Sequence, residues 1–265
     1  MPLLEINSLS LGYGTREIFR GIDAREDAGV LIALLGPNGK GKSTLLRTIA
    51  GLEKVWKKEK AGKTNGDIFI EGKPIEDYSG RQASSMVSFV GTLTDRARFL
   101  SVKDMVGINS YFRTNWTGSL NRSEEERISK ALEMVGLEGF EDRECSSLSD
   151  GEFQRVAIAG ALVQDSSIIL LDEPTAFLDV ANKFLVTRLL KDIAHNTENR
   201  KLIIFSTHDL QLALQSCDRL WIMTSEGFFC GSAGQMIKEG VLDKMFDVEG
   251  MAFDPQRMMF VSKED

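Results

Sequence analysis

The chain has 265 residues, of which 42% are hydrophobic, and its formal net charge is −7. This is enough apolar material to bury a full core, in one large domain or two small ones. The acidic balance does not indicate a general nucleic-acid surface, so we expect no nucleic acid among the partners.

Three scattered cysteines, an odd number without a C-x-x-C pair, are typical of a reducing compartment rather than of disulfides or structural zinc. The longest apolar runs, Val30 to Leu35 and Ile168 to Leu171, are far shorter than the roughly 18 residues that a membrane-spanning helix needs. The first ten residues lack both the basic and the apolar regions of a secretory signal. We therefore expect a cytoplasmic protein without a transmembrane segment.

Apolar runs typical of strands alternate with helical patterns along the chain, and no internal repeat is present, which predicts an α/β fold. The expected strands are Leu3–Leu9, Val30–Leu35, Ile68–Glu71, Met86–Val90, Ile168–Asp172, Leu202–Ser206 and Leu220–Thr224. The continuous apolar character of the runs at 168–172 and 202–206 predicts strands that are buried on both faces.

Strand patterns stop between Thr92 and Leu148, where helical patterns predict an inserted helical subdomain. One helix is expected over Ser123–Val135, and the spacing of Ser123 and Glu126 fits a capping box at its start. The basic stretch Lys54–Lys63 is interpreted as a solvated loop in preference to a phosphate- or partner-binding site.

Residues 36–44 read GPNGKGKST and match the phosphate-binding pattern G-x-x-x-x-G-K-[ST] between an expected strand and an expected helix over Ser43–Ala50. The glycines let backbone N–H groups curl around phosphates at the positive end of the helix. Lys42 is expected to neutralise the β and γ phosphates, and the Ser43 hydroxyl to bind Mg²⁺. A glycine-rich turn with a chance lysine is the alternative, which the flanking elements disfavour. The expected ATP-binding residues of the loop are Gly36, Pro37, Asn38, Gly39, Lys40, Gly41, Lys42, Ser43 and Thr44.

Residues 168–173 read IILLDE, a hydrophobic strand that ends in two carboxylates. This is the Walker B pattern, in which Asp172 holds Mg²⁺ and Glu173 orients the water that attacks the γ-phosphate. Alone, the pair before Pro174 could be a solvent-facing turn. The phosphate-binding loop upstream favours the functional interpretation.

Residues 148–152 read LSDGE and precede a helix expected over Phe153–Gln164. Ser149 can cap that helix and Gly151 permits close backbone approach, so a second anion-binding helix terminus is one interpretation. An ordinary capped helix start is the other, and LSDGE alone favours it.

GPNGKGKST, LSDGEFQRVAIAGAL, IILLDEPTAFLD and STHD occur in the order and spacing of ATP-binding cassette (ABC) nucleotide-binding domains, and the resemblance covers essentially the whole chain. It implies a P-loop NTPase (RecA-like) core with an N-terminal antiparallel β region and an inserted α-helical subdomain. Residues 1–265 are then one nucleotide-binding domain. Its core is 1–91 and 165–265, and the helical subdomain with the signature motif is 92–164.

By the same resemblance LSDGE is the family signature, whose Ser149, Gly151 and Glu152 complete the ATP site of a second copy in a head-to-tail homodimer. Asp179 corresponds to an acid at the dimer interface. The signature has Asp150 where glycine is most usual and Glu152 where glutamine is, both at positions where the family varies.

The resemblance also implies that His208 contacts the γ-phosphate and acts with Glu173 in catalysis, and that Tyr13 stacks on adenine. His208 could instead be a helix-start residue, and Tyr13 a turn aromatic. Thr92 stands where the family usually has a glutamine that contacts Mg²⁺ or the lytic water. We hypothesise that the shorter Thr92 hydroxyl meets the metal through water.

The function implied is the ATP-hydrolysing subunit of an importer, with ATP and Mg²⁺ as cofactors. Its partners would be a second copy of itself, transmembrane permease subunits and an extracytoplasmic substrate-binding protein, at the cytoplasmic face of the cell membrane. The segments around the signature and STHDLQLALQSCDRLWIM are similar to subunits that energise uptake of iron-siderophore, haem or cobalamin complexes. A soluble non-transport ABC ATPase of the iron–sulfur cluster assembly type and an exporter subunit are the alternatives.

Overall fold

The computed structural model describes residues 1–56, 67–92, 99–109, 122–245 and 251–262. The basic stretch Lys54–Lys63 lies outside these residues from position 57 onward. Across the described ranges, none of the helices combines the length and the apolar character that crossing a bilayer requires.

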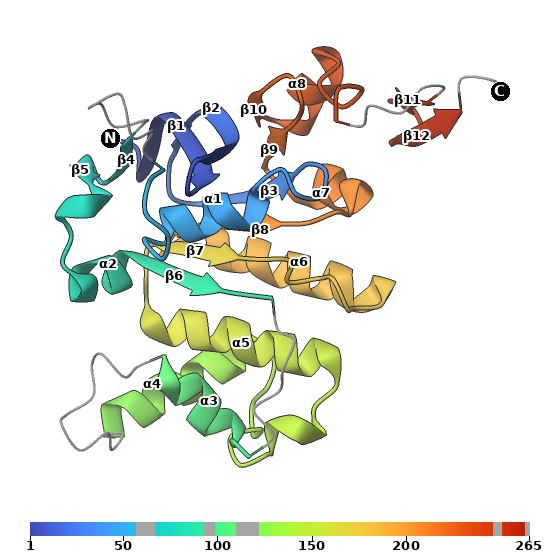
Figure 1. Cartoon of the computed structure of the whole chain (residues 1–265). Coiled ribbons are helices and arrows are strands. Elements are labelled where there is room, and N and C mark those ends of the chain that lie inside the picture. The colour runs from blue at the N-terminus through green and yellow to red at the C-terminus, as the bar shows by residue number, and fades with distance from the viewer. Residues whose placement is uncertain (57–66, 93–98, 110–121, 246–250, 263–265) are drawn as a thin grey trace.

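A six-stranded sheet with the order β10-β9-β3-β8-β7-β6 forms the centre of the molecule (Figure 1). Its strands are β3 (Val30–Leu35), β6 (Val87–Val90), β7 (Ile168–Leu171), β8 (Leu202–Ser206), β9 (Arg219–Met223) and β10 (Phe228–Gly231). All neighbouring pairs are parallel except β9 and β10. The carboxyl ends of the parallel strands therefore meet at one edge, which is where ligands bind in sheets of this type.

The parallel strands are buried on both faces, as their continuous apolar runs predicted. In β3, Leu31, Ala33 and Leu35 belong to one hydrophobic cluster, together with residues of the helices on that side. Ile32 and Leu34 belong to the other, on the face covered by α1 (Lys42–Ile49) and a second sheet. Each face of the sheet thus contributes to its own core.

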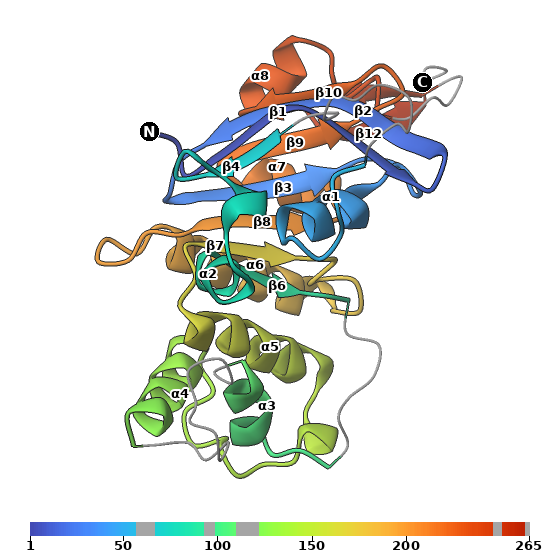
Figure 2. The same cartoon turned by 60° about the vertical axis from the view of Figure 1, so that its left-hand side comes forward.

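The second sheet is antiparallel, with the order β2-β1-β4-β5 (Figure 2). Its strands are β1 (Leu4–Tyr13), β2 (Arg16–Glu26), β4 (Asp67–Ile70) and β5 (Lys73–Pro74). The α/β class with an N-terminal antiparallel region is confirmed. The sequence analysis missed β2, in which exposed and buried residues alternate irregularly and the register with β1 shifts three times.

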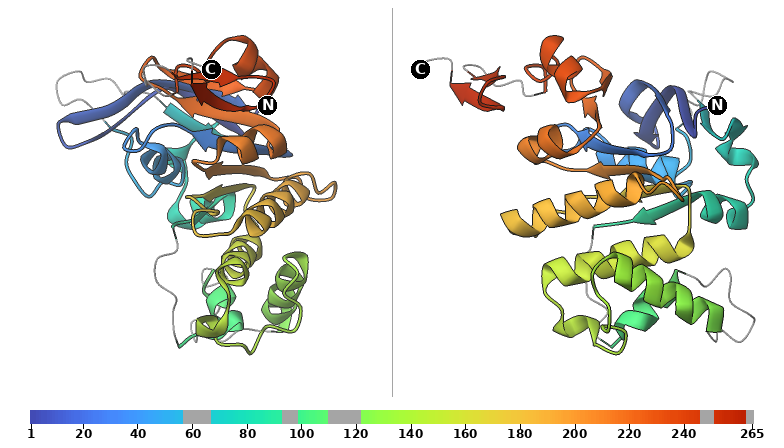
Figure 3. Two further views of the ribbon diagram at one scale, coloured as in Figure 1. Left: turned by 90° about the vertical axis from the view of Figure 1, so that its right-hand side faces the viewer. Right: turned by 180° about the vertical axis from the view of Figure 1, so that it is seen from behind.

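The remaining elements are mainly helices, and α3, α4 and α5 lie together at the end of the molecule remote from the antiparallel sheet (Figures 1 and 3). The bounds are α2 (Gly80–Met86), α3 (Val102–Ile108), α4 (Arg122–Met134), α5 (Asp150–Gln164), α6 (Val180–Ala194), α7 (Leu210–Ser216), α8 (Ala233–Lys238), η1 (Ile75–Asp77), η3 (Cys145–Ser147), β11 (Met251–Asp254) and β12 (Met259–Ser262). Between Thr92 and Leu148 the regular elements of the described backbone are helices, apart from an isolated bridge between Ser101 and Glu144.

The predicted cap of α4 is wrong. The helix begins at Arg122, so Ser123 lies in the first turn instead of capping it. Arg122 donates from Nε to Glu126 Oε1 at 3.2 Å, an i,i+4 ion pair that uses the carboxylate expected to complete the capping box.

Glu26 connects the antiparallel sheet to the central sheet. Its side chain is only 3% exposed and its Oε1 accepts hydrogen bonds from Trp221 Nε1 at 2.9 Å and Arg219 Nε at 3.1 Å. Burial raises the pKa of Glu26, and the Trp221 and Arg219 contacts offset part of that rise. The buried, hydrogen-bonded Glu26 carboxylate therefore holds β2 against β9.

We expect Glu26→Ala to lower the free energy of unfolding by about 2 kcal/mol, because it leaves the buried Trp221 N–H and part of the Arg219 charge without their acceptor. Urea denaturation measures the change. Glu17→Ala, on the same strand, is the matched control: Glu17 and Arg20 form an exposed ion pair at 3.9 Å, so the loss should stay below about 0.5 kcal/mol. Equal losses in the two variants would contradict the structural role of Glu26.

Candidate nucleotide site

The phosphate-binding loop connects β3 to α1 at the carboxyl edge of the central sheet. Gly36, Gly39 and Gly41 all have positive φ angles, of 150°, 76° and 100°. A Cβ at Gly36 would lie 2.6 Å from the backbone oxygen of Met223, so only glycine fits there. Asn38 is exposed at the tip of the loop.

Lys42 is buried and curls back over the loop. Its Nζ donates to the backbone oxygens of Gly36 at 2.7 Å and Pro37 at 3.3 Å. Burial lowers the pKa of Lys42, while the nearby Glu173 and Asp172 carboxylates act in the opposite direction. The Lys42 ammonium therefore lies inside the phosphate-binding loop.

Asp172 directly follows β7 and is the most buried acid of the site, with a side chain 3% exposed. Its Oδ1 accepts hydrogen bonds from Ser43 Oγ at 2.9 Å and Ser206 Oγ at 2.8 Å. Its Oδ2 lies 4.0 Å from Arg47 Nη2. The two predicted metal ligands, Ser43 and Asp172, are therefore in direct contact.

Glu173 has a backbone φ of 52°, in the left-handed region that non-glycine residues seldom adopt. Its N–H donates to Ser206 Oγ at 2.8 Å. Its Oε1 lies 2.7 Å from Nε2 of His208, which stands between β8 and α7. The two predicted catalytic side chains are brought together, and both are partly exposed.

Thr92 and Tyr13 also reach the residues described so far, which we call the first cluster: Lys42, Ser43, Asp172, Glu173 and His208. Thr92 follows β6 by two residues, and its Oγ1 donates to the backbone oxygen of Asp172 at 3.3 Å. Tyr13 ends β1, with 51% of the residue exposed, and its hydroxyl lies 3.1 Å from Thr44 Oγ1 in the first turn of α1. An exposed ring beside the phosphate loop suits a stacking surface for a base.

The signature residues form a second cluster at the start of α5. Ser149 caps the helix as predicted, and its N–H and Oγ both donate to Glu152 Oε2, at 2.8 and 2.7 Å. These hydrogen bonds lower the pKa of Glu152. No hydrogen bond or ion pair in the described residues joins Ser149, Gly151 or Glu152 to the phosphate-binding loop.

Asp179 belongs to this second cluster. It caps α6, accepting from the Asn182 N–H at 2.8 Å and from Asn182 Nδ2 at 3.0 Å. A Cβ added to Gly151 would lie 2.8 Å from Asn182 Oδ1, so the glycine lets α5 approach α6 closely. Asn182 thus connects the predicted interface acid to the signature.

The sequence analysis missed Ser206 and Asn182. Ser206 is fully buried and contacts both acids of the first cluster, and its sequence signal is its place as the first residue of STHD, at the end of an apolar strand. Asn182 carries no motif, and only its position three residues after the capping Asp179 distinguishes it.

Comparisons with known proteins find relatives of one family. A family model described as ABC transporter matches residues 19–176. A petrobactin import ATP-binding protein of Bacillus anthracis is 34% identical, over 83% of this chain and 78% of the relative. An energy-coupling factor transporter ATP-binding protein of Methanocaldococcus jannaschii is also 34% identical, over 94% and 83%. A solved structure of a transporter assigned to the metal-chelate type, in an inward-facing conformation, matches with a TM-score of 0.78 and 25% identity, over 99% of this chain and 96% of that one.

Proposed function

This chain belongs to the ABC transporter family and is an ATP-binding ATPase, and on that premise we propose that it powers import through a separate membrane permease. It would then act at the cytoplasmic face of the membrane, bound to permease subunits. The observation that carries the catalytic part of the proposal is the 2.7 Å contact between Glu173 and His208, beside the buried Asp172 and the phosphate-binding loop.

In this proposal the residues of the first cluster divide the work along the nucleotide. The Tyr13 ring receives the adenine, and the N–H groups of residues 36–44 bind the phosphates at the start of α1. Lys42 exchanges the carbonyls of Gly36 and Pro37 for phosphate oxygens. Glu173 orients the attacking water and His208 contacts the γ-phosphate.

The donor set at Asp172 fits Mg²⁺. Ser43 Oγ and Asp172 Oδ1 are hard oxygen atoms that already lie together, 2.9 Å apart, and Asp172 is shielded from bulk water. Ser43 and Asp172 would hold the ion, with Thr92 reaching it through water. When bound, Mg²⁺ would stabilise the negative charge that develops on the phosphates during transfer.

The second cluster supports a homodimer. No described contact joins Ser149, Gly151, Glu152 or Asp179 to the phosphate-binding loop of their own chain. In the proposed dimer, the second cluster of one copy therefore completes the ATP site at the phosphate-binding loop of the other copy. When ATP binds, the Ser149 N–H and hydroxyl would give up one of their two hydrogen bonds to Glu152 and donate it to the phosphate instead. Two copies and two ATP molecules then form closed composite sites.

The cargo we propose is a metal chelate, of the iron-chelate, haem or cobalamin type, delivered by an extracytoplasmic binding protein. Import is supported by the petrobactin import relative, and a chelate by the metal-chelate type of the solved transporter. The energy-coupling factor relative, also 34% identical, is named for another kind of transporter, so the ATPase activity is shared more widely than the cargo.

Glu173→Gln should lower kcat for ATP hydrolysis by about a hundredfold or more, because the amide cannot accept a proton from the attacking water. ATP affinity should change little, and ATP should trap a stable dimer, measured by size-exclusion chromatography with light scattering.

Lys42→Ala should instead weaken ATP binding by about tenfold, since it removes the charge facing the phosphates.

The exposed Glu133→Gln, on α4, is the control for the loss of one carboxylate and should hydrolyse ATP at the original rate. An equally fast rate in Glu173→Gln would remove Glu173 from the role of base.

Thr92→Ala should raise the Mg²⁺ concentration that half-saturates hydrolysis by about threefold, because the contact we propose is a single water-mediated one. Thr92→Ser keeps the hydroxyl and should behave like the original chain. Unchanged Mg²⁺ dependence in Thr92→Ala would show that the hydroxyl does no more than contact the Asp172 backbone.

Purification from its native cells under mild detergent tests the transport assignment. We expect the chain to co-purify with a polytopic membrane protein, and ATP turnover of the complex to rise with a metal-chelate-loaded binding protein. Recovery with soluble scaffold proteins alone would favour the non-transport ATPase. ATP-driven uptake of cargo into inside-out membrane vesicles would favour an exporter.

A further inference from the structure

The Tyr13 hydroxyl is held by two side chains, Thr44 of the phosphate-binding loop and Glu53, which no motif assigns. The hydroxyl donates to Glu53 Oε1 at 2.8 Å. The phenol oxygen is then an acceptor for Thr44 Oγ1 at 3.1 Å. The hydroxyl is fixed from two directions while the ring stays open to a ligand.

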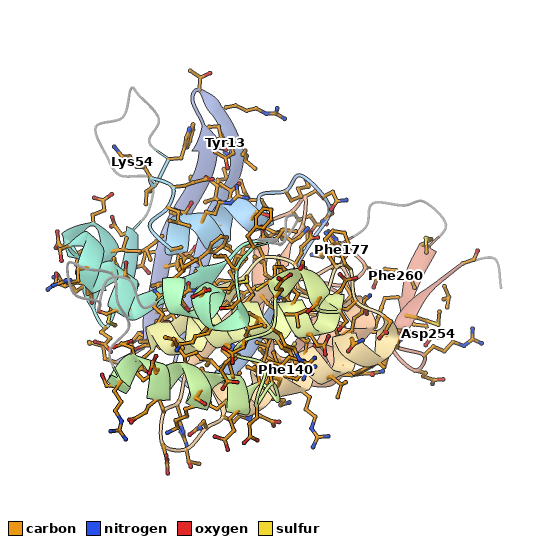
Figure 4. The ribbon with its side chains drawn as sticks, turned by 90° about the horizontal axis from the view of Figure 1, so that it is seen from below. Tyr13, Lys54, Phe140, Phe177, Asp254 and Phe260 are labelled. Carbon is orange, nitrogen blue, oxygen red and sulfur yellow. The ribbon has the colours of Figure 1, made fainter. Side chains whose placement is uncertain are left out.

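The turn that carries Tyr13 is held by the same segment. Trp56, only 7% exposed, donates from Nε1 to the Gly14 backbone oxygen at 2.9 Å. A Cβ at Gly12 would lie 2.7 Å from the Trp56 ring, so glycine is required for this contact. Figure 4 shows Tyr13 on the β1–β2 hairpin, near the segment of Lys54. Residues 53–56 therefore contact both the hydroxyl and the backbone of the base platform.

Glu53 is in turn fixed to α1. After the helix, the N–H groups of Leu52 and Glu53 both donate to the Arg47 backbone oxygen, at 2.9 and 3.3 Å. This turn places the Glu53 carboxylate 3.5 Å from Arg47 Nη1, and Nη2 of the same guanidinium lies 4.0 Å from Asp172. Arg47 thus lies between the carboxylate that holds Tyr13 and the acid of the phosphate site.

We propose that Glu53 is a positioning residue for the nucleotide base: anchored by Arg47, its carboxylate fixes the Tyr13 ring in the orientation that receives adenine. This rests on the proposed role of Tyr13 as the base platform. A platform that is already ordered does not lose side-chain freedom when ATP binds, so affinity rises without a new contact to the ligand. Glu53 then acts on the base and not on the phosphates.

The alternative is that Arg47 and Glu53 form a surface ion pair with a structural role only. Such pairs contribute little to the free energy of unfolding. The two roles differ in what they predict for ligands with and without a base. A positioning role depends on the Tyr13 hydroxyl and on adenine, whereas a structural role affects all ligands of the loop equally.

The test measures binding of ATP and of inorganic tripolyphosphate, which lacks a base, to the full chain by calorimetry. Glu53→Ala should weaken ATP binding by about three- to tenfold, the range expected from ordering one side chain, and leave tripolyphosphate binding unchanged. Glu53→Gln keeps an acceptor oxygen and should recover most of the loss. Glu133→Ala, an exposed glutamate of α4, is the control and should match the original chain.

A double-mutant cycle identifies the path of the effect. In a Tyr13→Phe background the ring remains but the hydroxyl is absent, so Glu53→Ala should have no further effect on ATP binding. A full additional loss in that background, or an equal loss for tripolyphosphate, would overturn the proposal. Thermal unfolding of each variant identifies a loss that comes from misfolding, and in that case Glu53→Gln in the same cycle decides.

Failure of the underlying assignment looks different. If Tyr13→Ala binds ATP as tightly as the original chain, Tyr13 is not the base platform and the proposed site is wrong at that point. If Tyr13→Ala weakens ATP binding but Glu53→Ala does not, the platform stands and only the role of Glu53 is refuted.

Discussion

The buried Asp172 carboxylate, which accepts hydrogen bonds from Ser43 and Ser206, is the contact on which the arrangement of the site depends. Its three participants follow or end three adjacent strands, since Ser43 comes after β3, Ser206 ends β8 and Asp172 follows β7. Thr92, beyond the next strand β6, donates to the Asp172 backbone. A carboxylate nearly free of solvent is stable only with such partners. The contact therefore fixes the phosphate loop relative to the strand ends that carry the acids.

Ser206 also supports the unusual backbone conformation at Glu173. A non-glycine residue at φ 52° costs on the order of 1 kcal/mol or more and persists where the surroundings determine it. Here Ser206 Oγ accepts from the Glu173 N–H while donating to Asp172, so one hydroxyl orients two successive acids in different directions. As a result Glu173 leaves the line of β7 and meets His208 from the neighbouring strand connection.

How much the sequence could predict depends on whether the signal was local. The strands β3 and β8 were predicted to the residue because burial on both faces requires a continuous apolar run. Ser43, Asp172 and Ser149 were identifiable because a loop, a strand end and a capped helix each have a local pattern. Ser206, Asn182 and Glu53 were not, since each acquires its role from a partner distant in sequence or outside any motif. The irregular register of β2 hid its alternation in the same way.

Within the described residues, the signature and Asp179 are fixed to each other, while no hydrogen bond or ion pair joins them to the phosphate-binding loop, and this has a consequence for the proposed dimer. Asn182 binds Asp179 and packs under Gly151, so the interface acid and the signature move as one unit. A phosphate bound by the signature of one copy must then also place that copy's Asp179 beside the other copy's site. The energy of closure is shared between the two positions instead of being set by the phosphate alone, and by linkage any change at Asn182 affects both.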